Sequence, residues 1–147
     1  MSLVYLDTSA LANRYLRAPI SDAVDALLDE PAHTFALSEL SLVELESALS
    51  RQHREGRVTA RKLSALRTRF ESDLRLDFFT LHPLSRPILI GARQLIADGI
   101  APLAALDAIH VKTALEIEAD AFATDDEQLA RAAARHGLEV ITFSSPP

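Results

Sequence analysis

Short apolar segments alternate along the chain with longer segments in which apolar residues recur every three or four positions. The short segments are typical of buried strands and lie at residues 3–6, 34–37, 78–81, 121–124 and 139–143. The longer segments predict helices that end near residue 16 and span about 20–28, 38–54, 59–74, 84–97 and 103–118, with a last helix over LARAAARHG. Strands that alternate with helices indicate an α/β fold with a mostly parallel sheet covered on both faces.

Residues with strong backbone preferences mark several predicted boundaries. Ser38 and Thr59 precede helices and are suited to cap them, because their hydroxyls accept hydrogen bonds from unpaired backbone N–H groups. Pro31 ends the helix near residue 28, and Gly56 closes the helix that ends near residue 54. Pro102 is expected to open the helix that follows it.

Acids follow two of the predicted strands at the point where a helix begins. Asp7 ends LVYL, and AFAT is followed by Asp125, Asp126 and Glu127. A helix start accounts for such residues, since they cap the backbone and complement the helix dipole. However, ligand sites in open parallel sheets also lie beyond the carboxyl ends of the strands. These acids are therefore candidates for one shared site.

Two further acids lie on predicted helices. In LAALDAIHVKTALEIEA, the helical wheel places Asp107 within or beside an apolar stripe that also holds Leu106 and His110. A buried carboxylate requires a cation, a donor or a metal, and His110 one turn away is a structural partner. His110 is itself interpreted as a packed core histidine. Glu44 shares a helix side with Ser41 and Ser47, but alone it is typical of a surface glutamate.

Composition narrows the possible classes of protein. The 147 residues are 48% apolar and fit a single domain over residues 1–147. There is no cysteine, which argues against a disulfide framework, a thiolate zinc site or a cysteine nucleophile and favours a cytoplasmic location. No secretory or membrane-spanning pattern is present in the sequence. The net charge of −6 argues against a protein that coats nucleic acid by electrostatics alone.

Positive charge is nevertheless concentrated in one region, between Arg51 and Arg75. A solvated pair of helices explains such a pattern, and a surface that contacts a phosphate backbone is the alternative. The candidate RNA-binding residues in that case are Arg51, Arg54, Arg57 and Arg61.

Several carboxylates without cysteines suit hard divalent cations, which prefer oxygen ligands and are used in phosphodiester hydrolysis. At this point four segments resemble the PIN domain nucleases, and within them the VapC toxins of toxin-antitoxin pairs. The segments, in order, are LDTSAL, SLVELESALSR, LDAIHVKTAL and ATDDEQLARAAARHGLEVI. The resemblance implies a three-layer α/β/α sandwich with about five mostly parallel strands. It also implies four acids that bind Mg²⁺, with Mn²⁺ as a substitute, to cut RNA.

Carried over by motif, the resemblance assigns the catalytic acids as Asp7, Glu44, Asp107 and Asp126. Of these, Asp7, Asp107 and Asp126 are the expected metal ligands, whereas Glu44 orients water or holds a ligand. The pattern Thr-x-Asp-x-x-Leu selects Asp126 over the adjacent Asp125, which stays an alternative. The supporting residues are Ser9, Thr124 and Asp125. Water is the implied nucleophile, and the implied products carry a 3′-hydroxyl and a 5′-phosphate.

The resemblance also implies an RNA substrate, a VapB-like antitoxin as partner, and a homodimer. The leading hypothesis is thus an endoribonuclease toxin, and the alternative is a PIN-like dimeric module that acts by interaction and co-repression. A phosphotransfer enzyme of the haloacid dehalogenase kind would need a second acid where Ser9 stands. A receiver domain would need a late functional lysine, and neither Lys62 nor Lys112 is suitably placed.

Overall fold

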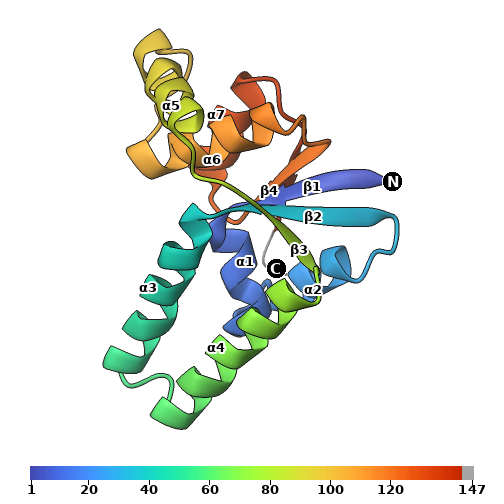
Figure 1. Ribbon diagram of the computed structural model, residues 1–147, viewed down its shortest axis with the longest axis vertical. Helices are drawn as coiled ribbons and strands as arrows, with labels where there is room; N and C mark the ends of the chain where they lie inside the picture. Colours follow the sequence, from blue (N-terminus) through green and yellow to red (C-terminus); the bar gives the residue numbers. More distant parts are fainter. Residues whose placement is uncertain (144–147) are drawn as a thin grey trace.

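Five parallel strands form one sheet at the centre of the computed structural model, which describes residues 1–143. The strand order is β3-β2-β1-β4-β5, and every pairing is parallel (Figure 1). The strands are β1 (Ser2–Leu6), β2 (His33–Ser38), β3 (Phe79–His82), β4 (Ala121–Thr124) and β5 (Val140–Thr142). The predicted strands and their parallel arrangement are confirmed.

Helices cover both faces of the sheet, as Figure 1 shows. One face carries α1 (Thr8–Tyr15), α2 (Ser21–Leu28), α3 (Leu40–Arg54) and α4 (Ala60–Arg75). The other carries α5 (Arg86–Asp98), α6 (Ala105–Glu116) and α7 (Glu127–Arg135). Side chains alternate across a strand, so Val4 and Leu6 pack into the first apolar cluster while Tyr5 packs into the second. The three-layer α/β/α architecture is confirmed.

Two of the predicted helix starts are wrong in detail. Pro102 does not open α6, which begins at Ala105 after the extended residue Ala104. Ser38 is the last residue of β2 rather than the N-cap of α3, although its Oγ accepts a hydrogen bond from the Leu40 N–H at 3.0 Å. Before α6 the backbone is still extended at Ala104, whereas β2 passes directly into α3 through Glu39, which already has a helical conformation. The cap at Thr59 is confirmed, since its hydroxyl accepts from the Lys62 N–H.

The single apolar stripe predicted for α6 is also wrong in part. Leu106 is 48% exposed, whereas Ala108, Val111 and His110 are almost fully buried. The reason is that α6 packs against α5 on one side and contributes to the apolar cluster against the sheet on another. A helix covered from two directions has no simple polar and apolar halves.

Helices α3 and α4 form a long hairpin that projects from the sheet (Figure 1). Gly56 closes α3 with a φ of 77°, a left-handed conformation that favours glycine. The turn lies at the far end of the hairpin from the sheet. Among the described residues, no helix is both long enough and apolar enough to cross a membrane.

Candidate active site at the carboxyl edge of the sheet

Asp7 is the most deeply buried acid of the candidate set, with an exposed fraction of 4%. It follows β1 and caps α1, because its Oδ1 accepts a hydrogen bond from the Ala10 N–H at 3.0 Å. The Ser9 hydroxyl donates to the same oxygen at 2.7 Å, and the Thr124 hydroxyl donates to Oδ2 at 2.6 Å. Burial raises the pKa of Asp7 even though these donors oppose the shift. Asp7 therefore caps a helix and also presents an immobilised carboxylate at the sheet edge.

The same two hydroxyls join the ends of β1 and β4. Ser9 Oγ accepts a hydrogen bond from the Asp125 N–H at 2.9 Å, and Thr124 Oγ1 accepts one from the Asp126 N–H at 3.0 Å. The two oxygens lie 3.3 Å apart. Each hydroxyl thus orients Asp7 while also holding the backbone of the acidic pair that opens α7.

Glu44 lies on the second turn of α3 and reaches the same edge of the sheet. Its side chain is 24% exposed, and its Oε1 accepts hydrogen bonds from Thr8 Oγ1 at 2.7 Å and from His110 Nε2 at 2.6 Å. Burial opposes ionisation of Glu44, but the hydrogen bonds from His110 and Thr8 outweigh it, so its pKa is lowered. The surface glutamate expected from the sequence alone is therefore half-buried and held in place.

Asp107 is the acid with the fewest restraints. It lies in the first turn of α6 and is partly buried. Burial raises its pKa, and the negative charges of Asp126, Asp7 and Glu44 raise it further, while His110 opposes the shift. Within residues 1–143, no hydrogen bond to its carboxylate is found, so His110 pairs with Glu44 instead of Asp107. Three acids from distant parts of the chain therefore lie near enough to Asp107 to perturb its carboxylate.

The adjacent acids of β4–α7 have different surroundings. Asp126 caps α7, because its Oδ1 accepts from the Gln128 and Leu129 N–H groups at 2.9 and 3.1 Å. Its charge acts more strongly on Asp107 than that of any other acid. Burial, Asp7 and Asp126 raise the pKa of Asp125, whereas a hydrogen bond from Asn13 lowers it. Asp126 therefore faces the Asp107 side of the cluster, and Asp125 faces the Asp7 and Asn13 side.

A family model matches most of the chain and identifies its family. The PIN domain profile matches residues 4–135. The chain belongs to the PIN domain family. PIN domains are generally nucleases, and PIN nucleases generally use divalent metal ions.

Solved structures share the fold of this PIN domain at low sequence identity. FitAcB from Neisseria gonorrhoeae is 21% identical, with a TM-score of 0.65 over 94% of this chain and 96% of the other. VapBC2 from Rickettsia felis, bound to a promoter DNA fragment, is 14% identical, with a TM-score of 0.65 over 97% and 99%. VapC20 from Mycobacterium tuberculosis, a sarcin-ricin loop cleaving toxin, is 16% identical, with a TM-score of 0.64 over 88% and 94%. No curated protein matches the chain significantly.

The oxygen-rich donor set suits a hard divalent cation that keeps several of its waters. Within residues 1–143, no three acidic or histidine side chains form a ready-made metal cage. Internal donors hold Asp7 and Glu44 in place, whereas no hydrogen bond to the Asp107 carboxylate is found in that part of the chain. Mg²⁺ is commonly bound by one or two carboxylates together with substrate phosphates. The PIN domain site fits that mode of binding rather than an all-protein cage.

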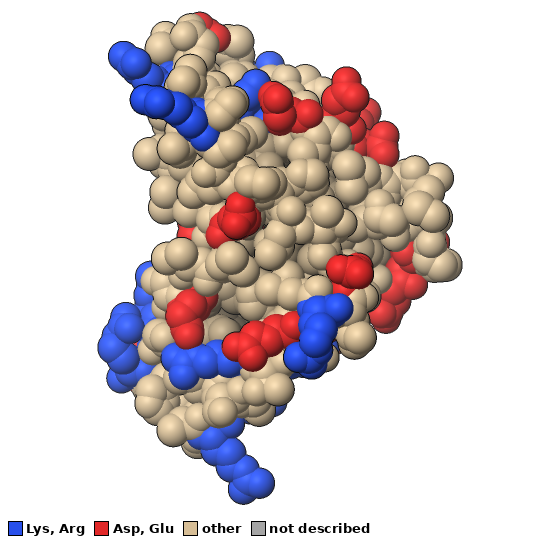
Figure 2. Space-filling model, in the orientation of Figure 1, with Lys and Arg blue, Asp and Glu red and all other residues tan. Residues whose placement is uncertain are grey.

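The candidate RNA-binding residues near the α3–α4 turn are not brought to the acids. Arg54 follows Glu44 by ten residues of helix, which corresponds to about 15 Å. Figure 2 shows Lys and Arg side chains gathered at this end of the molecule. Arg57 forms an ion pair with Glu55, and Arg67 pairs with Glu46 at 2.6 Å. Solvated and partly paired helices describe this region well.

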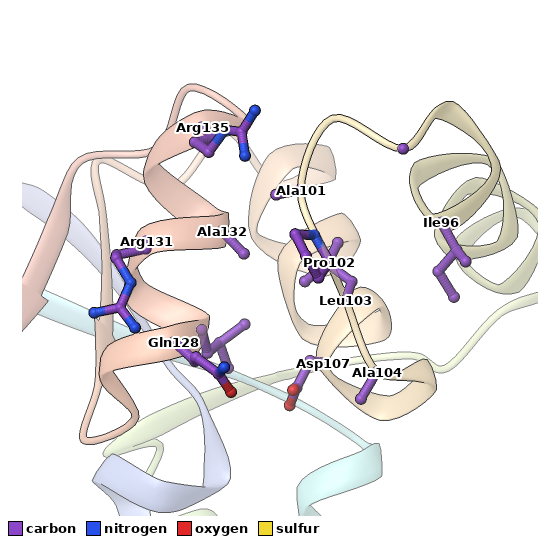
Figure 3. A pocket seen from close by; sticks show the side chains of 12 residues that line it. Ile96, Ala101, Pro102, Leu103, Ala104, Asp107, Gln128, Arg131, Ala132 and Arg135 are labelled. Atoms are coloured by element: carbon purple, nitrogen blue, oxygen red, sulfur yellow. The ribbon is translucent and has the colours of Figure 1, made fainter.

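A groove that the sequence did not indicate lies beside Asp107. It has a volume of about 830 Å³ and runs between α7 and the connection from α5 to α6. In Figure 3, Asp107 and Gln128 lie at its lower end, and Arg131 and Arg135 lie on successive turns of α7. Among the described residues, neither arginine takes part in an ion pair. The alternation of Arg and Ala in LARAAAR was the available signal, since it gives one helix an apolar side and a basic side.

Proposed function

We propose that this PIN domain is a metal-dependent endoribonuclease of the VapC kind, which hydrolyses RNA phosphodiester bonds. The observation that carries the proposal is the meeting of Asp7, Glu44, Asp107 and Asp126 at the carboxyl edge of the sheet, where Asp107 feels the charge of the other three. One structural relative, VapC20 from Mycobacterium tuberculosis, is a sarcin-ricin loop cleaving toxin, which supports RNA as the substrate class.

The chain's own residues have separate roles in this proposal. Asp7 and Asp107, with Asp126, hold a divalent ion, and Glu44 orients water or a ligand. Such an ion supplies Lewis acidity toward the phosphate and the attacking water. Asp7 needs no rearrangement to act, because Thr124 and Ser9 already hold both of its oxygens. Mg²⁺ is the proposed ion, and Mn²⁺ is the proposed substitute.

We propose that the RNA strand extends from the acids along the groove beside Asp107. Arg131 and Arg135 are one helical turn apart, about 6 Å, and can each pair with a phosphate. The apolar floor of the groove, which includes Leu103 and Ala132, suits an unstacked base rather than a duplex. The basic residues near the α3–α4 turn lie farther away and serve at most in longer-range guidance.

A VapB-like antitoxin and a second copy of this chain are the proposed protein partners. The solved relatives include toxin-antitoxin complexes, one of them from Klebsiella pneumoniae. Helix α5 exposes Leu89, Ile90 and Ile96, with exposed fractions of 46, 61 and 44%, which is unusual for a surface that stays in water. Light scattering of Ile90→Asp against the unchanged protein tests the homodimer, since a buried aspartate would dissociate it.

The function is tested by incubating the purified protein with a structured RNA and Mn²⁺ or Mg²⁺. We expect cleavage that EDTA abolishes and that Asp7→Asn or Asp107→Asn reduces at least a hundredfold. Asp25→Asn, which changes an acid of α2 outside the site, is the matched control and should cleave normally. Robust cleavage by both site variants would refute the proposal. If the unchanged protein binds neither Mg²⁺ nor Mn²⁺ at the acids, the alternative of a PIN-like module that acts by interaction and co-repression is favoured instead.

A further inference from the structure

A chain of buried hydrogen bonds ends on Glu44 and begins in the core of the sheet. The Tyr5 hydroxyl lies 2.5 Å from His110 Nδ1, and His110 Nε2 lies 2.6 Å from Glu44 Oε1. His110 is 2% exposed and Tyr5 is fully buried. These residues come from β1, α6 and α3, and their sequence separations are 105 and 66 residues. The three side chains therefore connect three elements that the chain brings together only on folding.

The direction of each hydrogen bond follows from the partner at its end. An ionised Glu44 can only accept, and Thr8 Oγ1 already donates to the same oxygen, so His110 Nε2 must carry a hydrogen. The Tyr5 phenol is protonated at neutral pH and is fully buried, so its hydroxyl has a hydrogen to donate. The Tyr5 hydroxyl can therefore donate a hydrogen bond to His110 Nδ1, which is an acceptor when the imidazole is neutral.

We infer that Tyr5 and His110 are positioning residues that hold the Glu44 carboxylate toward the acidic site, with Tyr5 setting the Nε2–H tautomer of His110. The inference rests on the proposed nuclease function for its catalytic consequence, and on geometry alone for the tautomer. Hydrogen-bonded partners behind the groups at a metal site typically contribute 10- to 100-fold to affinity or activity.

Packing holds the Tyr5–His110–Glu44 series of hydrogen bonds in place. The Tyr5 ring stacks on Phe122, with centroids 5.4 Å apart, and meets the His110 ring edge-on at 5.8 Å. Thr8 Oγ1 also lies 2.9 Å from Ser41 Oγ, which ties α1 to α3 beside Glu44. Since the rings cannot reorient without disturbing the core, Glu44 keeps one rotamer before any substrate arrives.

The chain offers a matched control in a second tyrosine. Tyr15 is 3% exposed, and its hydroxyl donates to Asp73 at 2.6 Å, in an ion-pair network between α1 and α4. Tyr15→Phe removes the same hydroxyl as Tyr5→Phe, from a comparably buried ring, but from a network without contact to Glu44. Any general effect of losing a tyrosine hydrogen bond should appear in both variants.

The test has a spectroscopic arm on the metal-free protein. Nitrogen-15 NMR of the imidazole rings at pH 7.5 distinguishes a protonated from a bare nitrogen, and His110→Gln identifies which of the 5 histidine signals belongs to residue 110. We expect a proton on Nε2 and a bare, hydrogen-bonded Nδ1, with loss of the Nδ1 hydrogen-bond shift in Tyr5→Phe but not in Tyr15→Phe. A proton on Nδ1 in the unchanged protein would overturn the inference.

The second arm measures RNA cleavage at saturating substrate. We expect His110→Ala to lower kcat by about 10- to 100-fold with little change in KM. His110→Gln, whose amide can still donate to Glu44, should recover most of that loss. Equal kcat values for Tyr5→Phe, Tyr15→Phe and the unchanged protein would refute the positioning role. If the unchanged protein cleaves no RNA, the proposed function fails, and the spectroscopic arm still decides how Glu44 is held.

Discussion

Replacing Asp107 by Asn should stabilise the metal-free protein while it abolishes RNA cleavage. The ionised Asp107 has a raised pKa because it is partly buried and because Asp126, Asp7 and Glu44 add negative charge around it. Asn has nearly the same shape without the charge, and no hydrogen bond to the carboxylate is lost among the described residues. The substitution therefore removes repulsion that the folded protein has and the unfolded chain lacks.

The size of this effect follows from the linkage between pKa and stability. Each unit by which folding raises a carboxyl pKa costs about 1.4 kcal/mol when the group is ionised. Water and salt screen a partly exposed group, so we expect a gain on the order of 1 kcal/mol. For a chain of this length, that gain raises Tm by about 2–4 °C.

The sign of the pH dependence is fixed by the raised pKa. The destabilisation by Asp107 is fully present above its folded pKa and declines as the pH falls through that value. It is absent below the unfolded pKa of about 4, where both states bind the proton. The advantage of Asp107→Asn over the unchanged protein should therefore be present at pH 7.5 and vanish near pH 3.5.

Asp73→Asn provides a control of opposite sign. Burial opposes ionisation of Asp73, but hydrogen bonds from Arg14 and Tyr15 outweigh it and lower its pKa. Its contribution is therefore present above the unfolded pKa and is lost as the pH falls through the folded pKa. We expect Asp73→Asn to lower stability by about 2 kcal/mol at pH 7.5.

The assay is thermal unfolding followed by circular dichroism in EDTA at several pH values, with RNA cleavage measured on the same samples. Mn²⁺ at 100 times its Kd should raise the free energy of unfolding of the unchanged protein by about 2.7 kcal/mol and so raise its Tm. The rise should be much smaller in Asp107→Asn. A Tm for Asp107→Asn at or below that of the unchanged protein at pH 7.5 would refute the argument from repulsion.

Four further substitutions separate structural from catalytic roles. Thr124→Val keeps the shape of the side chain but removes the donor to Asp7, so it should lower the free energy of unfolding in urea by about 1–3 kcal/mol. It should also reduce cleavage about tenfold or more, and an unchanged cleavage rate would contradict this role. Asp126→Asn should retain the α7 cap and stability but lose cleavage, and Asp125→Asn should lose less; the reverse order would make Asp125 the fourth acid. Thr59→Ala should lower stability by about 1 kcal/mol with normal cleavage, because it removes only the α4 cap; an unaltered Tm would argue against that contribution.

The fold was largely predictable because its signals are local. The five apolar segments are strands within one residue of their expected bounds, since central parallel strands are buried on both faces and read as continuous apolar runs. The error at Pro102 has a physical reason: the chain stays extended through Ala104 to carry α6 back onto α5 and the sheet. The preference of proline for the first turn of a helix does not reveal how many residues lie between Pro102 and the start of α6.

The candidate site was predictable only in part because its decisive contacts are non-local. Asp7 can be recognised from the end of a strand, but Glu44 has no local feature that separates it from Glu39 or Glu46. Its distinction arises when α3 folds against α1 and α6, which brings in Thr8 from 36 positions away and His110 from 66. Family resemblance supplied Glu44 as a residue, and only the three-dimensional structure supplies its partners.

The same contacts explain why the acids are not equivalent. Thr124 and Ser9 donate to Asp7, His110 and Thr8 donate to Glu44, and the first N–H groups of α7 donate to Asp126. Asp107 receives the negative charge of the others without such a donor, so its ionisation costs the folded protein stability. A cation placed there would relieve that cost, and so the removal of Asp107 should weaken metal binding while it stabilises the metal-free protein.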